Sequence, residues 1–284
     1  MNETVAYLMA FQAAKGLGPK TLASYASQIS QIKDDRSAYH LLEEIKDKYP
    51  GRIKGLPNFD TFQGAAEKAM SCLITQEKQG IHAISCTDKD FPSGFKDLDV
   101  PPLYIFYKGN KEALKQKGIA VIGTRNVTDY TQRVGEHIGS YMAKKGWSVV
   151  SGLALGSDAS GHRGCLNANG TTVAIVATSL DRVYPWKNKP LQDEILAKGG
   201  CVVSEYPIGT PFIVQHLIAR DRLQSGLAQG VFVVATGEKG GTWHAINEAV
   251  KLHKPICFYD YTKIKTYDYK KDEHTLGMAK MKSL

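Results

Sequence analysis

The chain has 284 residues, of which 43% are hydrophobic and 23% are charged. This length and balance predict a globular protein with one large and one small domain, and they exclude a disordered chain. The formal net charge is +8. A positive charge of this size favours a polyanionic partner such as a nucleic acid.

The five cysteines are odd in number and contain no CxxC pair. This pattern argues against a disulfide framework or a zinc site, and it is typical of a protein from a reducing compartment. No apolar run approaches the length of about 18 residues that a membrane helix needs, and the N-terminus lacks a signal-peptide pattern. We therefore expect a cytoplasmic protein that has no cofactor, no metal and no membrane partner.

Residues 1–78 are predicted to form a helical domain of the helix-hairpin-helix or SAM type. Val5, Leu8 and Phe11 form an apolar stripe at helical spacing. The stripe ends at "KGLG", and Pro19 suits the first turn of a second helix. Such a hairpin can offer backbone N–H groups to a DNA phosphate, or it can be a plain corner between helices. With a single copy in the chain, we favour the corner.

Residues 79–112 are expected to be a connecting segment. Turn residues and prolines, including Pro92 and Pro101, interrupt it. One strand-like run stands at Leu103–Tyr107. The segment therefore predicts little regular structure apart from that strand.

Strand-like and helical patterns alternate over residues 113–261. The expected strands are Ile119–Ile122, Ser148–Val150, Thr172–Val176, Cys201–Val203, Val231–Ala235 and Ile256–Tyr259. This alternation predicts an α/β fold with a Rossmann-like, doubly wound and mostly parallel sheet, preceded by the small helical domain. Residues 262–284 are expected to form a basic tail, which either adds nonspecific attraction for DNA or is simply solvated.

The clearest helical pattern covers Asp129–Lys145, with Thr128 or Asp129 as its cap. Val134, Ile138, Tyr141 and Met142 share one face of this helix. An apolar stripe of this kind is typical of the side of a helix that faces the core.

Glycines, hydroxyls and basic residues follow the expected strand ends. Ligands of doubly wound sheets bind at this carboxyl edge, where backbone N–H groups and helix N-termini can face an anion. The loops therefore predict a phosphate-binding site. Its candidate residues are Gly123, Thr124, Arg125, Ser151, Gly152, Gly156, Lys187, Lys189, Arg220, Arg222, Gly240, Gly241 and Thr242.

Arg125 is the strongest single candidate, because it directly follows the turn after the first strand of the expected sheet. A guanidinium group there can make bidentate contacts with a phosphate. The alternative is a buried structural pair with Asp158 or Glu205. Neither interpretation is decided by the sequence.

Seven segments between about Gly80 and Tyr259 resemble the DprA/Smf family of DNA-processing proteins. In chain order they are "PPLYIFYKGN", "IAVIGTRNVT", "VVSGLALGSDASGH", "LDRVYPWKNK", "SEYPIG", "ARDRLQSGL" and "GGTWHAINEA". The resemblance covers roughly two thirds of the chain, and the shared order of the segments makes it far more specific than any single loop.

The resemblance implies a Rossmann-like domain that binds single-stranded DNA in a basic pocket, forms a homodimer, protects incoming DNA and loads RecA during natural transformation. It supplies no catalytic residues, so we expect no enzyme. Bases of the bound strand would splay out and stack on aromatic side chains such as Tyr184, Trp186 or Phe212.

Two departures from the family pattern leave a second hypothesis open. Asp221 stands where family members usually have asparagine, and Gly240-Gly241-Thr242 resembles a loop of the related lysine-decarboxylase-like phosphoribohydrolases. Their catalytic glutamate should follow within about one helical turn of the threonine, but here Glu248 comes later. Catalysis of this kind is disfavoured, whereas a pocket for a nucleotide or signalling molecule, possibly serving defence, stays open.

Overall fold

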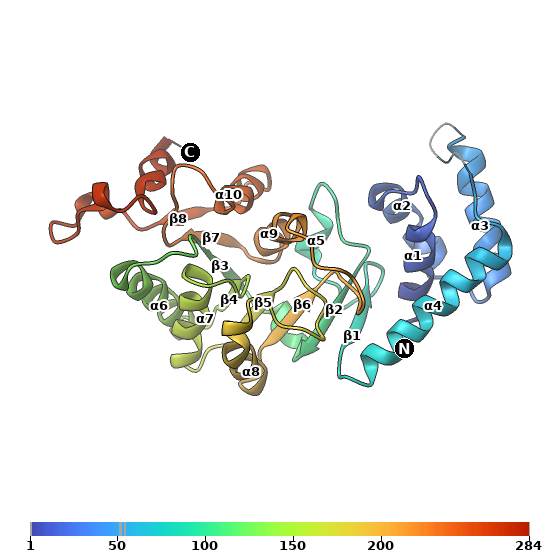
Figure 1. The fold of residues 1–284 in the computed structure, drawn as a ribbon, viewed down its shortest axis with the longest axis horizontal. Coiled ribbons are helices and arrows are strands. Elements are labelled where there is room, and N and C mark those ends of the chain that lie inside the picture. The colour runs from blue at the N-terminus through green and yellow to red at the C-terminus, as the bar shows by residue number, and fades with distance from the viewer. Residues whose placement is uncertain (1, 51–52, 54, 284) are drawn as a thin grey trace. The chain divides into compact units, whose positions relative to one another are not determined.

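The computed structural model describes residues 2–50, 53 and 55–283 (Figure 1). The chain divides into two compact units. The first consists of residues 1–107 together with 205–209, and the second of residues 108–204 together with 210–284. Within the described ranges, no helix is both long enough and apolar enough to cross a membrane.

The first unit begins with four helices. They are α1 (Glu3–Ala13), α2 (Pro19–Ile29), α3 (Asp35–Lys48) and α4 (Phe59–Glu77). The side chains of Asn2, Asp34 and Asn58 cap α1, α3 and α4 by accepting backbone N–H groups of the first turn. As predicted, α2 starts with Pro19 after the glycine break. The apolar stripe of α1 is buried, and the ring of Phe11 packs edge-on against the ring of Phe62 in α4.

Short elements complete the first unit. Strand β1 (His82–Ser85) pairs antiparallel with β2 (Tyr104–Gly109), and the short helix α5 (Ser93–Lys96) lies between them in the chain. The expected strand at 103–107 corresponds to β2. Strand β1 escapes the sequence pattern because its residues neither alternate nor form a continuous apolar run, and only its last two residues are buried.

The second unit is built on six parallel strands. They are β3 (Gly118–Ile122), β4 (Ser148–Ser151), β5 (Thr172–Ile175), β6 (Cys201–Ser204), β7 (Gly230–Val233) and β8 (Ile256–Phe258). Their order is β6-β5-β4-β3-β7-β8. Strands β4 to β7 are buried along their whole length, which explains their continuous apolar runs. The predicted Rossmann-like, doubly wound fold is confirmed.

Helices cover both faces of this sheet. They are α6 (Asp129–Lys144), α7 (Ser157–Asn167), α8 (Lys189–Ala197), α9 (Gln215–Leu227) and α10 (Thr242–Lys251), with short 3-10 turns η1 (Lys111–Lys115) and η2 (Trp186–Asn188). In Figure 1, α6, α7 and α8 lie on one side of the sheet, and α9 and α10 lie on the other. The chain order β3, β4, β5, β6 then β7 places the switch point of the sheet beside β3.

Helix α6 is capped as predicted, but its buried face, which includes Val134, matches the predicted face only in part. Thr128 forms a reciprocal capping box with Thr131. The buried residues are Thr131, Val134, Gly135 and Gly139, whereas Tyr141 is 50% exposed. The reason is that α6 packs mainly on α7 and less on the sheet, and it approaches α7 so closely that a Cβ atom on Gly139 would collide with the α7 backbone. The expectation that Tyr141 faces the core is wrong.

The C-terminal segment is folded. It contains the 3-10 turns η3 (Tyr261–Lys263), η4 (Tyr269–Lys271) and η5 (Leu276–Ser283). The Tyr261 hydroxyl donates a hydrogen bond to the Val234 carbonyl at 2.7 Å, and Met278 and Met281 are buried. The Gly277 N–H donates to the Thr236 carbonyl at 2.9 Å. The expectation of a solvated tail is therefore wrong, because apolar side chains anchor this segment beside the end of β7.

Candidate nucleic-acid interface

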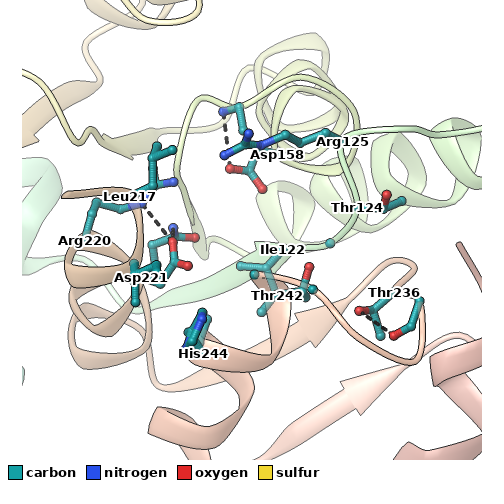
Figure 2. Close-up of a pocket in the computed structure, with 18 of the residues that line it drawn as sticks. Ile122, Thr124, Arg125, Asp158, Leu217, Arg220, Asp221, Thr236, Thr242 and His244 are labelled. Carbon is teal, nitrogen blue, oxygen red and sulfur yellow. Dashed lines mark hydrogen bonds and ion pairs between the residues drawn. The ribbon is translucent and has the colours of Figure 1, made fainter. Parts of the chain in front are cut away.

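A cavity of about 490 Å³ opens at the carboxyl edge of β3 and β7. The loops after β3, β4 and β7 line it together with α9 and α10, and side chains from all of them converge on it in Figure 2. Its volume lies in the range of small-ligand sites. Of the candidate residues, it brings together Gly123, Thr124, Arg125, Arg220, Gly240, Gly241 and Thr242.

The turn after β3 is held in place by backbone contacts. The Thr124 N–H donates to the Ala235 carbonyl at 2.8 Å, and the Thr124 carbonyl accepts from the Ser157 N–H at 3.0 Å. Gly156 has a φ of 76°. A Cβ atom there would stand 2.5 Å from the carbonyl oxygens of Thr124 and Arg125. Gly156 therefore contributes the close approach of two loops rather than a ligand contact.

Arg125 follows this turn with an exposed side chain that borders the cavity. Within the described part of the chain, its guanidinium has no hydrogen bond and no ion pair. Asp158 instead accepts the backbone N–H groups of Gly152 at 3.1 Å and Ala154 at 3.3 Å. The interpretation of Arg125 as half of a buried pair is therefore wrong. Its donors are free for an anion.

Helix α10 directs its N-terminus at the same cavity. Gly241 stands at the cap position and makes no side-chain capping bond. The N–H groups of Trp243 and His244 donate to the carbonyls of Gly240 at 3.3 Å and Gly241 at 2.9 Å, whereas the Thr242 N–H has no hydrogen bond to the described residues. Gly240, Gly241, Thr242 and the exposed Lys239 all line the cavity. An open helix N-terminus beside a lysine and an arginine attracts phosphate.

Arg220 is a structural residue. It is 4% exposed, and its Nη1 donates to the carbonyls of Gly152 at 2.5 Å and Ile175 at 2.6 Å. Its Nε pairs with Asp221 at 3.0 Å, as the dashed line in Figure 2 marks. Although it borders the cavity, its bonded donors point to the protein. The prediction that Arg220 contacts a phosphate is therefore wrong for these bonded donors.

Two neighbouring candidates are structural for the same reason. A Cβ atom on Gly152 would collide with the Arg220 guanidinium, so this glycine makes room for that group. Ser151 is fully buried, and its hydroxyl donates to the Val121 carbonyl at 2.6 Å. Neither residue can reach a phosphate in the cavity.

Three basic candidates lie outside the cavity lining. Lys189 pairs with Asp193 at 2.5 Å, and Arg222 donates to the Ala219 carbonyl at 2.7 Å. Lys187 is exposed in the turn η2. They can only contact a ligand that extends beyond the cavity.

Aromatic side chains flank the site. The rings of Tyr184 and Phe212 lie 4.6 Å apart, and Tyr184 is 42% exposed. Tyr184, Leu155 and Arg125 line a smaller hollow next to the cavity. Trp186 is 69% exposed. Tyr184 and Leu155 thus leave apolar surface available beside the Arg125 side chain.

The floor of the cavity is acidic, which sequence reasoning missed. Burial raises the pKa of Asp158, against the lowering effect of Arg220. Burial also raises the pKa of Asp221 to about 6, opposed by Arg220 and reinforced by Asp158. Gln224 lies one turn after Asp221 and also lines the cavity. The spacing of Asp221 and Gln224 on one helix face was the available signal.

The folded C-terminal segment adds His274 to the cavity wall. The Gly277 bond to Thr236 holds this segment against the loop after β7, and the Trp243 indole N–H donates to the Gly237 carbonyl at 3.0 Å. No local pattern indicates this placement, because the contact joins parts of the chain about 40 residues apart.

Comparison with known proteins decides the family. The model of the family "DNA recombination-mediator protein A" matches residues 82–276. The chain belongs to this family. The DNA processing protein DprA of Bacillus subtilis (strain 168) is 37% identical over 225 residues, which cover 79% of this chain and 70% of that protein. Protein Smf of Synechocystis is 30% identical over 264 residues, 90% of this chain and 64% of that protein.

Solved DprA structures share the fold. The X-ray structure of DprA from Streptococcus pneumoniae superposes with a TM-score of 0.73 at 24% identity, covering 98% of each chain. A structure of DprA from Helicobacter pylori, which concerns the single-stranded DNA binding mode of that protein, has a TM-score of 0.62 at 26% identity and covers 72% of this chain and 87% of its own. The chain is thus a DprA-type DNA-processing protein.

The acidic floor makes the stability of this DprA-type protein depend on pH. Asp221 has a pKa of about 6 in the folded protein, against 3.8 for the free group. The folded state therefore holds this proton more tightly than the unfolded state. Its contribution to the free energy of unfolding is complete below pH 3.8 and is lost as the pH rises through 6, by about 3 kcal/mol at most.

Urea unfolding of the native protein and of Asp221→Asn between pH 4 and 7 measures this effect. The native protein is expected to lose stability relative to the variant as the pH rises, because only aspartate must ionise in the buried position. Parallel curves for the two proteins would contradict the assignment.

Proposed function

We propose that this chain binds single-stranded DNA at the carboxyl edge of the sheet in its second unit. The observation that carries the proposal is the exposed guanidinium of Arg125, which has no partner among the described residues and borders a cavity large enough for one nucleotide. Arg125, Lys239 and the N–H of Thr242 at the N-terminus of α10 would hold backbone phosphates. Membership of the DprA family and the DNA-binding mode described for the Helicobacter pylori relative support this assignment.

A single strand suits the site better than a duplex. The cavity is concave, so a base that enters it must first separate from any base with which it is paired. The exposed rings of Tyr184 and Trp186 offer stacking surface for unpaired bases, whereas paired bases keep their faces inside the duplex. We therefore infer a preference for single strands that does not depend on a long sequence motif.

The wider role follows from the family. We propose that the chain protects incoming single-stranded DNA, loads RecA onto it during natural transformation, and acts as a cytoplasmic homodimer. We also propose that it is not an enzyme. Glu248, the position nearest to a phosphoribohydrolase glutamate, pairs with Lys251 at 3.2 Å and does not line the cavity. The residues that line the cavity thus include phosphate-binding groups but not Glu248.

Fluorescence anisotropy of the full chain with a labelled single strand and its duplex, at two salt concentrations, tests the proposal. We expect tighter binding of the single strand than of the duplex. The logarithm of the binding constant should fall with the logarithm of the salt concentration, with a slope of about −0.7 for each neutralised phosphate. Equal affinity for both DNAs, or a flat salt response, would contradict it. Absence of binding to either DNA would favour the nucleotide-pocket hypothesis, which a panel of mononucleotides and cyclic nucleotides then tests.

A further inference from the structure

A buried glutamine on the cavity floor has an unused acceptor. Gln224 is 2% exposed and lines the cavity. Its Nε2 donates to Oδ1 of Asp221 at 3.2 Å. Because a carboxylate can only accept, the amide must turn its nitrogen to Asp221. This leaves Oε1 of Gln224 buried and without a partner in the part of the chain that the structure describes. A buried polar atom of this kind calls for a donor, which a ligand or a water molecule can supply.

Asp221 adds a second acceptor beside the first. Its Oδ1 already accepts from Arg220 and Gln224, whereas Oδ2 receives no hydrogen bond from the described residues. Arg220 cannot serve a ligand through its bonded donors, because Nε points at Asp221 and Nη1 points at two carbonyls. Asp158 also lines the cavity, and its Oδ2 already accepts the N–H groups of Gly152 and Ala154. The floor is therefore rich in acceptors and poor in free donors.

Apolar side chains of α9 lead from the cavity mouth to this floor. Val214, Leu217 and Ile218 line the cavity one to two turns before Asp221 and Gln224. A spacing of three, four and seven residues places them on the same face of the helix. A flat ring can pack against this apolar wall while its edge meets the two acceptors.

We propose that one nucleobase of the bound strand enters the cavity, and that Asp221 and Gln224 select bases with an exocyclic amino group over thymine. Cytosine offers its N4 amino group to the two acceptors, as adenine offers N6 and guanine offers N1–H and N2. Thymine offers a single ring N–H between two carbonyl oxygens. One of those oxygens would face a carboxylate oxygen and leave both groups unpaired, which costs affinity. The inference rests on the proposed binding of single-stranded DNA.

The experiment compares two labelled homopolymers of equal length, oligo-dC and oligo-dT, with the full chain at pH 7.5. Both have single-ring bases and the same backbone charge. We expect oligo-dC to bind about tenfold more tightly, the value of one well-placed base contact. In Asp221→Asn the side chain can turn a donor to the ligand, so the ratio is expected to fall close to one. The matched control Asp193→Asn makes the same change of charge outside the cavity and should keep the ratio of the native protein.

The outcomes separate the two proposals. Binding of both homopolymers with equal affinity by the native protein overturns the base selection and leaves DNA binding standing. A preference for oligo-dC that persists in Asp221→Asn, with a melting curve like that of the native protein, overturns the role of Asp221. Failure to bind either homopolymer overturns both proposals. The ratio of the native protein does not depend on whether any variant folds.

Discussion

Replacing Arg125 by alanine is expected to weaken binding of single-stranded DNA by roughly ten- to a hundredfold. The guanidinium is exposed and unpaired within the described residues, so its removal deletes interactions with the ligand and none within the protein. Hydrogen bonds to a charged group contribute about 1.5–3 kcal/mol each, which corresponds to this range. Anisotropy titrations at one low salt concentration measure the change, and the melting temperature should stay that of the native protein.

The matched control is Arg163→Ala. Arg163 is an exposed arginine of α7 that does not line the cavity. Both variants lose one positive charge, so nonspecific attraction falls equally in the two proteins. In Arg125→Ala, but not in Arg163→Ala, the slope of log affinity against log salt concentration should become shallower. The change is about 0.7 for each phosphate that is no longer neutralised. Equal weakening in both variants would mean that overall charge, rather than the cavity, holds the DNA.

Arg220→Ala is expected to lower the free energy of unfolding by roughly 3–5 kcal/mol, the usual cost of breaking a buried ion pair. The variant leaves the Asp221 carboxylate without its partner, and it removes the donor that serves the carbonyls of Gly152 and Ile175. The lowering effect of Arg220 on the pKa values of Asp158 and Asp221 also disappears. Chemical denaturation of the purified variant measures the loss.

Arg220→Lys provides a graded comparison. A single ammonium group cannot reproduce the rigid fork that serves two carbonyls and a carboxylate, so we expect an intermediate loss of stability. Arg163→Ala, on an exposed helix face, should change the free energy of unfolding by less than about 0.5 kcal/mol. A loss below about 1 kcal/mol in Arg220→Ala would show that solvent satisfies these groups, and the structural assignment would fail.

These two arginines explain why part of the site could not be predicted. Arg125 and Arg220 both belong to segments that resemble the DprA family, and both are candidates by residue type. Burial separates them, because α9 turns Arg220 into the protein while the turn after β3 leaves Arg125 in solvent. Burial depends on which elements pack together, and no local pattern contains that information.

The sequence by itself determined the parallel sheet, the switch-point loops and the family. Strands covered on both faces must be continuously apolar, and the glycines after them are required by close backbone approach, so both leave a local pattern. Only the tertiary structure decided that Tyr141 faces solvent, that the C-terminal segment folds back to place His274 in the cavity, and that Asp221 and Gln224 form an acceptor floor. Each of these depends on a contact between elements distant in the chain, whose partners are chosen by packing and by the pairing of buried polar groups.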